Sequence, residues 1–83
     1  MSDYRSKLAA RIAFMAYTQK EVAQKIKMSE MGFSNMMNGK TKNIHLSNVR
    51  KLMTALNCKA SDILNRRDML RYQHDLKKEM DIE

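Results

Sequence analysis

The chain has no proline, no tryptophan, only two glycines and one cysteine among its 83 residues. Without proline, and with few glycines and few aromatic or β-branched side chains, the composition favours helices throughout. The single cysteine, Cys58, excludes an internal disulfide. No apolar run approaches the roughly 20 residues that a membrane span requires, and the N-terminus lacks the apolar core of a signal peptide. We therefore expect one soluble, intracellular, all-α domain.

The patterns of catalysis and metal binding are also missing. There is no glycine-rich phosphate loop, no Cys–His pair at a plausible spacing and no pair of carboxylates in an expected pocket. His45 and His74 are far apart, with no cysteine or acidic cluster at ligand spacing. We expect neither an enzyme nor a metal site, and no pattern indicates a cofactor or a small-molecule ligand. Nothing near Cys58 would lower the pKa of its thiol, so we expect a small buried hydrophobe.

Positive charge is plentiful and unevenly distributed. The formal net charge is +7. Residues 1–64 carry eleven basic and four acidic side chains, whereas residues 65–83 carry five of each. A basic excess suits a polyanion such as nucleic acid, although many small domains are basic for solubility alone. The position of the charge is therefore more informative than its total.

Two short capped helices are predicted between Thr18 and Gly39. Thr18-Gln-Lys-Glu21 has the spacing of a capping box, in which each side chain accepts a hydrogen bond from the other residue's amide. Ser29 is a second N-cap candidate and opens a helix that Asn38-Gly39 would end. Two capped helices with a three- to four-residue connection are the layout of a DNA-binding helix-turn-helix.

Within the second of these helices, the spacing separates inward from outward side chains. Phe33 and Met36 are three residues apart and should face the core. The other faces carry Glu30, Met31, Ser34 and Asn35. Gly32 weakens the helix by roughly 1 kcal/mol relative to alanine. It either permits a close approach to DNA or only loosens the helix.

Three further helices should complete a five-helix domain. The first begins after Asp3 and runs to about Ala16, and a fourth runs from about Ser47 to Leu56, with Asn57 as a left-handed C-cap. A short fifth helix follows. The predicted core consists of Leu8, Ile12, Met15, Val22, Ala23, Ile26, Phe33, Met36, Ile44, Leu46, Val49, Leu52, Met53 and Leu56.

Residues 65–83 differ from the preceding sequence in having no net charge, and they are predicted to form a C-terminal amphipathic helix. Met69, Tyr72, Leu76 and Met80 form a narrow apolar seam among balanced charges. The seam can pack on the domain, pair with a second copy or bind another protein. We favour a homodimer through residues 66–83, because one such module buries little DNA surface. The chain therefore divides into a DNA-binding domain over residues 1–64 and a helical extension over residues 65–83.

Together these motifs resemble the lambda-repressor-like (Cro/cI-type, XRE family) helix-turn-helix domains of phage and bacterial regulators. The resemblance covers roughly residues 8–64 and is carried by TQKEVAQKI, MS, NGKTKNIHL and KLMTALNCKASDIL. It implies a sequence-specific regulator of transcription that binds double-stranded DNA, most simply a Cro-like or minimal repressor. It also implies a cytoplasmic protein, bacterial or phage-encoded in a bacterial host, and a dimer whose reading helices lie about 34 Å apart on the duplex.

The resemblance further implies two groups of DNA contacts. Base reading would fall to Glu30, Met31, Gly32, Ser34 and Asn35, and contacts to the sugar-phosphate backbone to Gln19, Ser29, Asn38, Lys40 and Lys42. The chemistry agrees in part. Lys40 and Lys42 are point charges for phosphate. Asn35 can make paired hydrogen bonds to adenine, Met31 could pack on a thymine methyl, and Glu30 could accept from a cytosine amino group.

Two positions depart from the family pattern. Lys27 stands at a turn position that usually holds glycine, and keeping that turn would require a positive φ. Met37 stands where a polar residue is common. The alternative is a protein-interaction module, an antitoxin-like or anti-repressor partner that keeps the fold and uses Met31, Met37 and the tail. Affinity for duplex DNA that falls steeply as salt rises would separate the two hypotheses.

Overall fold

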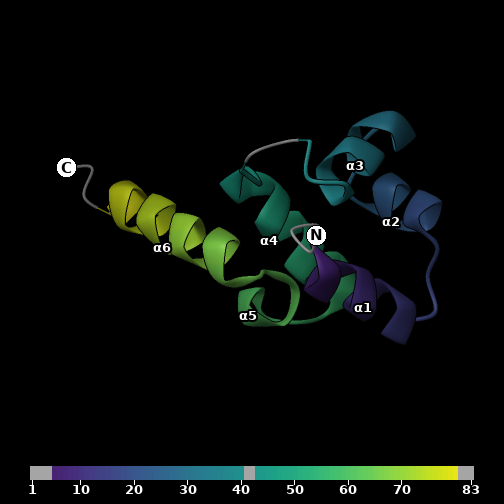
Figure 1. Ribbon diagram of the computed structural model, residues 1–83, viewed down its shortest axis with the longest axis horizontal. Coiled ribbons are helices and arrows are strands. Elements are labelled where there is room, and N and C mark those ends of the chain that lie inside the picture. The colour runs from purple at the N-terminus through teal and green to yellow at the C-terminus, as the bar shows by residue number, and fades with distance from the viewer. Residues whose placement is uncertain (1–4, 41–42, 81–83) are drawn as a thin grey trace.

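The structure, a computed structural model, describes residues 5–40 and 43–80. Among these residues the regular secondary structure consists of α-helices alone, which confirms an all-α fold of five helices followed by a C-terminal helix (Figure 1). The helices are α1 (Ser6–Phe14), α2 (Gln19–Lys25), α3 (Glu30–Met37), α4 (Leu46–Leu56), α5 (Ala60–Ile63) and α6 (Arg66–Met80). Asp3, the expected cap of the first helix, and Lys42 lie outside the described residues.

Four consecutive helices end in the same way. A residue with a positive φ follows the end of each helix: Ala16 (61°), Lys27 (60°), Gly39 (78°) and Asn57 (51°). In each case its amide and the next amide donate to carbonyls of the last turn, as when Met28 N–H binds Ala23 O at 2.8 Å. This is the Schellman arrangement. It confirms the left-handed conformations predicted for Lys27 and Asn57.

Helix boundaries differ from prediction by one or two residues. α1 ends at Phe14 rather than near Ala16, because Ala16 adopts the left-handed conformation that ends the helix. α4 begins at Leu46 rather than Ser47. Its N-cap is His45, whose Nδ1 accepts from the Ser47 amide at 3.2 Å. Histidine is not a usual N-cap residue, so this helix start could not be recognised from the residue types alone.

The core forms where the inward faces of α1 to α5 meet. Most of the predicted members are buried, including Leu8, Val22 and Leu52, which have 0% exposed area. Met15 and Met53 are only partly buried at its edge. α1 packs on α5, α2 on α3 and α4, and α4 on α5 and α6. The single core thus sets the relative positions of α2 and α3.

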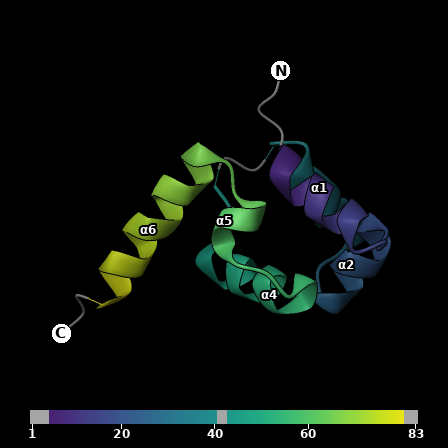
Figure 2. The same cartoon turned by 90° about the horizontal axis from the view of Figure 1, so that it is seen from below.

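The C-terminal helix α6 begins on the core and then projects from one end of the molecule (Figures 1 and 2). Met69 and Tyr72 pack against the core, and the Tyr72 hydroxyl lies 3.9 Å from Met53 Sδ. Leu70 and Met80 are 61% and 79% exposed. Met69 and Tyr72, the first half of the predicted seam, are therefore covered by the core of the same molecule. None of the described helices is both long and apolar enough to cross a membrane.

Candidate nucleic-acid interface

The start of α2 is fixed by the predicted capping box. Thr18 Oγ1 accepts from the Glu21 amide at 3.1 Å, and Glu21 Oε1 accepts from the Thr18 amide at 2.8 Å. The amides of Thr18 and Glu21, which have no acceptor within the helix, are therefore both hydrogen-bonded by neighbouring side chains. Gln19 is therefore the first helical residue, and its side chain is exposed.

The turn from α2 to α3 combines the left-handed Lys27 with a second cap at Ser29. Ser29 Oγ accepts from the Gly32 amide at 3.0 Å. A Cβ atom on Gly32 would also lie 3.0 Å from this oxygen, which is tighter than most real contacts. A side chain at position 32 would therefore require the Ser29 hydroxyl to shift by a few tenths of an ångström.

A hollow of about 510 Å³ lies between the start of α2 and the exposed side of α3. Its lining brings the predicted backbone contact Gln19 together with four of the five predicted base readers, and it is formed by Gln19, Lys20, Glu30, Met31, Phe33, Ser34 and Asn35. Gly32 does not line it. We call this hollow the reading face. Lys20 was not predicted, although its place beside Gln19 in the first turn of α2 was the available signal.

The side chains of α3 divide as the spacing predicted. Phe33 and Met36 are each 1% exposed, and Met31 is 75% exposed. Met37, however, is only 5% exposed. The interaction-module hypothesis placed Met37 on the partner surface, and this part of it is wrong, because the residue belongs to the core.

The segment after α3 carries two of the predicted backbone contacts. Asn38 is exposed, and its Nδ2 lies 3.4 Å from Ser34 Oγ. Lys40 is exposed too, and its amide donates to Asn35 O at 2.9 Å. The main chain at Lys40 is therefore tied to the last turn of α3, while its side chain is exposed.

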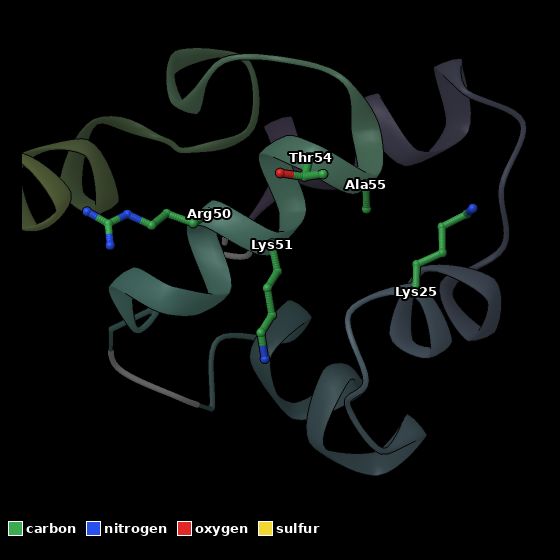
Figure 3. Close-up of a pocket in the computed structure, with 5 residues that line it drawn as sticks. All are labelled: Lys25, Arg50, Lys51, Thr54 and Ala55. Atoms are coloured by element: carbon green, nitrogen blue, oxygen red, sulfur yellow. The ribbon is translucent and has the colours of Figure 1, made fainter.

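A second hollow, of about 550 Å³, lies between α2 and α4 and is strongly basic (Figure 3). Its lining consists of Lys25, Arg50, Lys51, Thr54 and Ala55, none of which was predicted to bind DNA. Arg50 points toward α6 and forms an ion pair with Glu79 at 2.6 Å. Lys25 Nζ lies 4.9 Å from the centre of the Tyr17 ring. The positive charge is thus not confined to the reading face, and charge alone does not identify the DNA-binding side.

The remaining reactive side chains form no further site among the described residues. Cys58 is half-buried, and burial raises the pKa of its thiol although the charge of Arg11 opposes the change. A thiol with a raised pKa is a poor nucleophile at neutral pH. Over the described part of the chain, no three histidine, cysteine or acidic side chains gather as metal ligands would.

Comparison with known proteins places this geometry in context. The family model described as the Cro/C1-type HTH DNA-binding domain matches residues 7–68, which is most of the chain. No curated protein and no solved structure shows significant similarity to the chain. The match ends within α6, and the division into residues 1–64 and 65–83 stays a prediction.

Proposed function

We propose that this chain, which belongs to the Cro/C1-type helix-turn-helix DNA-binding family, is a sequence-specific regulator of transcription that inserts α3 into the major groove. One observation carries the proposal beyond the family assignment. The reading face gathers Gln19 and four polar or apolar side chains of α3 in one exposed hollow, at the end of α2 that begins with a capping box. The simplest action is that of a Cro-like or minimal repressor that occludes a promoter in the bacterial cytoplasm.

The chemistry of the side chains separates residues suited to contact bases from residues suited to contact the sugar-phosphate backbone. Asn35 offers a donor and an acceptor to an adenine edge, the exposed Met31 offers an apolar surface to a thymine methyl, and Glu30 accepts from a cytosine amino group. Gly32 and Ser34 complete the proposed base readers. The backbone contacts are assigned to Gln19, Ser29, Asn38, Lys40 and Lys42.

Selection of bound sites from a pool of random duplexes, at two salt concentrations, tests the proposal. We expect a defined sequence to be enriched, and its affinity to fall steeply with salt because phosphate contacts release counterions. Binding that is insensitive to salt, or a pool that shows no enrichment, would sink the repressor hypothesis. It would favour the interaction module, which the exposed Met31 on α3 supports.

We further propose that the protein binds paired half-sites as a homodimer through α6. Met80, at the far end of the seam, and Leu70, which lies outside the seam, are both exposed on this helix. Sedimentation equilibrium should show a dimer at micromolar concentration, and Leu70→Glu should shift it to monomer without loss of helix content. A full-length monomer at that concentration would contradict the dimer.

A further inference from the structure

Two charged side chains are buried among the described residues, and they come from opposite ends of the chain. Arg5, just before α1, is 4% exposed, and Asp68, in the first turn of α6, is 5% exposed. Arg5 Nε lies 3.1 Å from Asp68 Oδ2, in a contact that is electrostatic rather than a well-aligned hydrogen bond. A buried ion is tolerated only when it is compensated. Asp68 therefore allows the guanidinium to occupy this position.

The same guanidinium contacts the end of α3. Arg5 Nη1 donates to Met36 O at 2.6 Å. Met36 belongs to the last turn of the helix, at the negative end of the helix dipole, and its carbonyl also accepts from the Gly39 amide at 3.2 Å. The rigid, planar guanidinium thus places one nitrogen beside the Asp68 carboxylate while another donates to Met36 O. Arg5 thus connects the C-terminal end of α3 to the beginning of α6.

This connection is of a different kind from the other contacts that hold α3 on the core. Phe33, Met36 and Met37 are buried, and their apolar contacts set how deeply the helix lies. Such contacts are non-directional. The bond from Arg5 is directional and acts at the end of α3 that leads to Lys40. It therefore restrains the tilt of the helix rather than its depth.

We infer that Arg5 and Asp68 are positioning residues for DNA recognition. Through them the C-terminal helix, without touching DNA, holds α3 at the tilt at which its exposed side chains meet the base edges. This rests on the proposed function, because it requires α3 to be the reading helix. It gives α6 a part in sequence recognition that is separate from dimerisation.

The test replaces the buried pair with apolar side chains of similar size, Arg5→Met together with Asp68→Leu, a kind of exchange that buried ion pairs often tolerate. The matched control is Arg50→Met together with Glu79→Leu. It removes an exposed ion pair that also ties α6 to the domain, but it touches no atom of α3 in any contact described above. The two probes are the duplex that the wild-type protein selects from a random pool and a scrambled duplex of equal length and composition.

The buried-pair variant should lower the preference for the selected duplex over the scrambled one about tenfold, the order expected for the loss of one base contact. Its affinity for the scrambled duplex, and the salt dependence of that affinity, should stay as in the wild type. The control variant should keep the preference. An unchanged preference in the buried-pair variant overturns the positioning role. A wild-type protein without any preference overturns the proposed function instead.

A second variant keeps the test decisive if the first one unfolds. Arg5→Lys retains a positive charge beside Asp68 but lacks the planar fork, so it cannot hold both partners. It is assayed at a temperature at which circular dichroism shows native helix content. We expect a loss of preference of the same order, and displaced amide resonances at Met36 and Lys40. A folded Arg5→Lys protein with wild-type preference and unmoved resonances would contradict the inference.

Discussion

At the scale of single residues, the left-handed positions are the most unusual feature of the backbone. Ala16 and Lys27 adopt this conformation although both carry a Cβ atom. For an L-residue it is disfavoured by roughly 1–2 kcal/mol. The sequence indicated the strain at Lys27, because the surrounding motif identified a turn position. It did not indicate the strain at Ala16, because alanine is otherwise the best helix former.

Replacing Lys27 with glycine should stabilise the protein. The gain from relieving the positive φ exceeds the larger chain entropy of unfolded glycine, so we expect the free energy of unfolding to rise by about 0.5–1 kcal/mol. Urea denaturation measures the change. Gln24→Gly, at an exposed helical position in α2, is the matched control and should destabilise by about 1 kcal/mol. A decrease with Lys27→Gly comparable to that of the control would refute the strain argument.

Substitutions at Asn35 and Lys40 should affect DNA binding differently, one in a sequence-dependent and the other in a sequence-independent way. Asn35→Ala is expected to lose about 1–3 kcal/mol of discrimination at one base position. Lys40→Ala should weaken binding to every sequence alike and reduce the slope of affinity against salt by about one. Competition assays with single-base variants of the selected duplex measure both. Equal losses on every sequence from Asn35→Ala would remove it from the base readers.

At the scale of the helices, local hydrogen bonding explains what the sequence could predict. The capping box, the Ser29 cap and the left-handed Asn57 each depend on bonds between residues a few positions apart. Such bonds leave a pattern in the sequence. The contact of Arg5 with Asp68 and Met36 leaves none, because only the folded core brings the three together. For the same reason Lys25, Arg50 and Lys51 were not predicted to share a hollow.

The capping box gives a prediction at this scale. Thr18→Ala removes the oxygen that accepts from the Glu21 amide and should lower the free energy of unfolding by about 1 kcal/mol. Thermal denaturation followed by circular dichroism measures the effect. Thr54→Ala, at an exposed position inside α4, is the control and should be neutral or slightly stabilising because alanine favours helices. Similar melting temperatures for the two variants would mean that the cap contributes little.

At the scale of the whole molecule, α6 belongs to the fold at one end and projects at the other. Asp68, Met69 and Tyr72 pack against the rest of the protein, whereas near the other end Met80 faces solvent and Glu79 reaches α4 only through its exposed ion pair with Arg50. The apolar seam predicted the helix and its amphipathic character. The pattern of the seam did not show where α6 loses contact with the core, because that point depends on the direction in which the chain leaves α5.

Truncation from the C-terminus should therefore lower the melting temperature abruptly once it removes the first turns of α6. Residues 1–66 lack Asp68, so Arg5 loses its buried ion pair, and they also lack Met69 and Tyr72, which pack against the core. Removing one partner of a buried ion pair typically destabilises by about 3–5 kcal/mol. Residues 1–74 keep Asp68, Met69 and Tyr72 and should unfold close to the temperature of the full chain. Thermal unfolding of the two proteins gives the comparison. Equal melting temperatures would show that the pair adds no stability.

The four left-handed helix ends also provide built-in reporters of local opening. The amides of Tyr17, Met28, Lys40 and Cys58 each donate back to a helix carbonyl, at 3.1, 2.8, 2.9 and 3.1 Å. Because each of these protons is released only when its own helix end unwinds, their hydrogen-exchange rates should report four separate events within one folded molecule. The Lys40 amide follows α3. Its exchange rate, compared with those of Met28 and Cys58, would show whether bound DNA slows local opening at the end of α3 alone or throughout the domain.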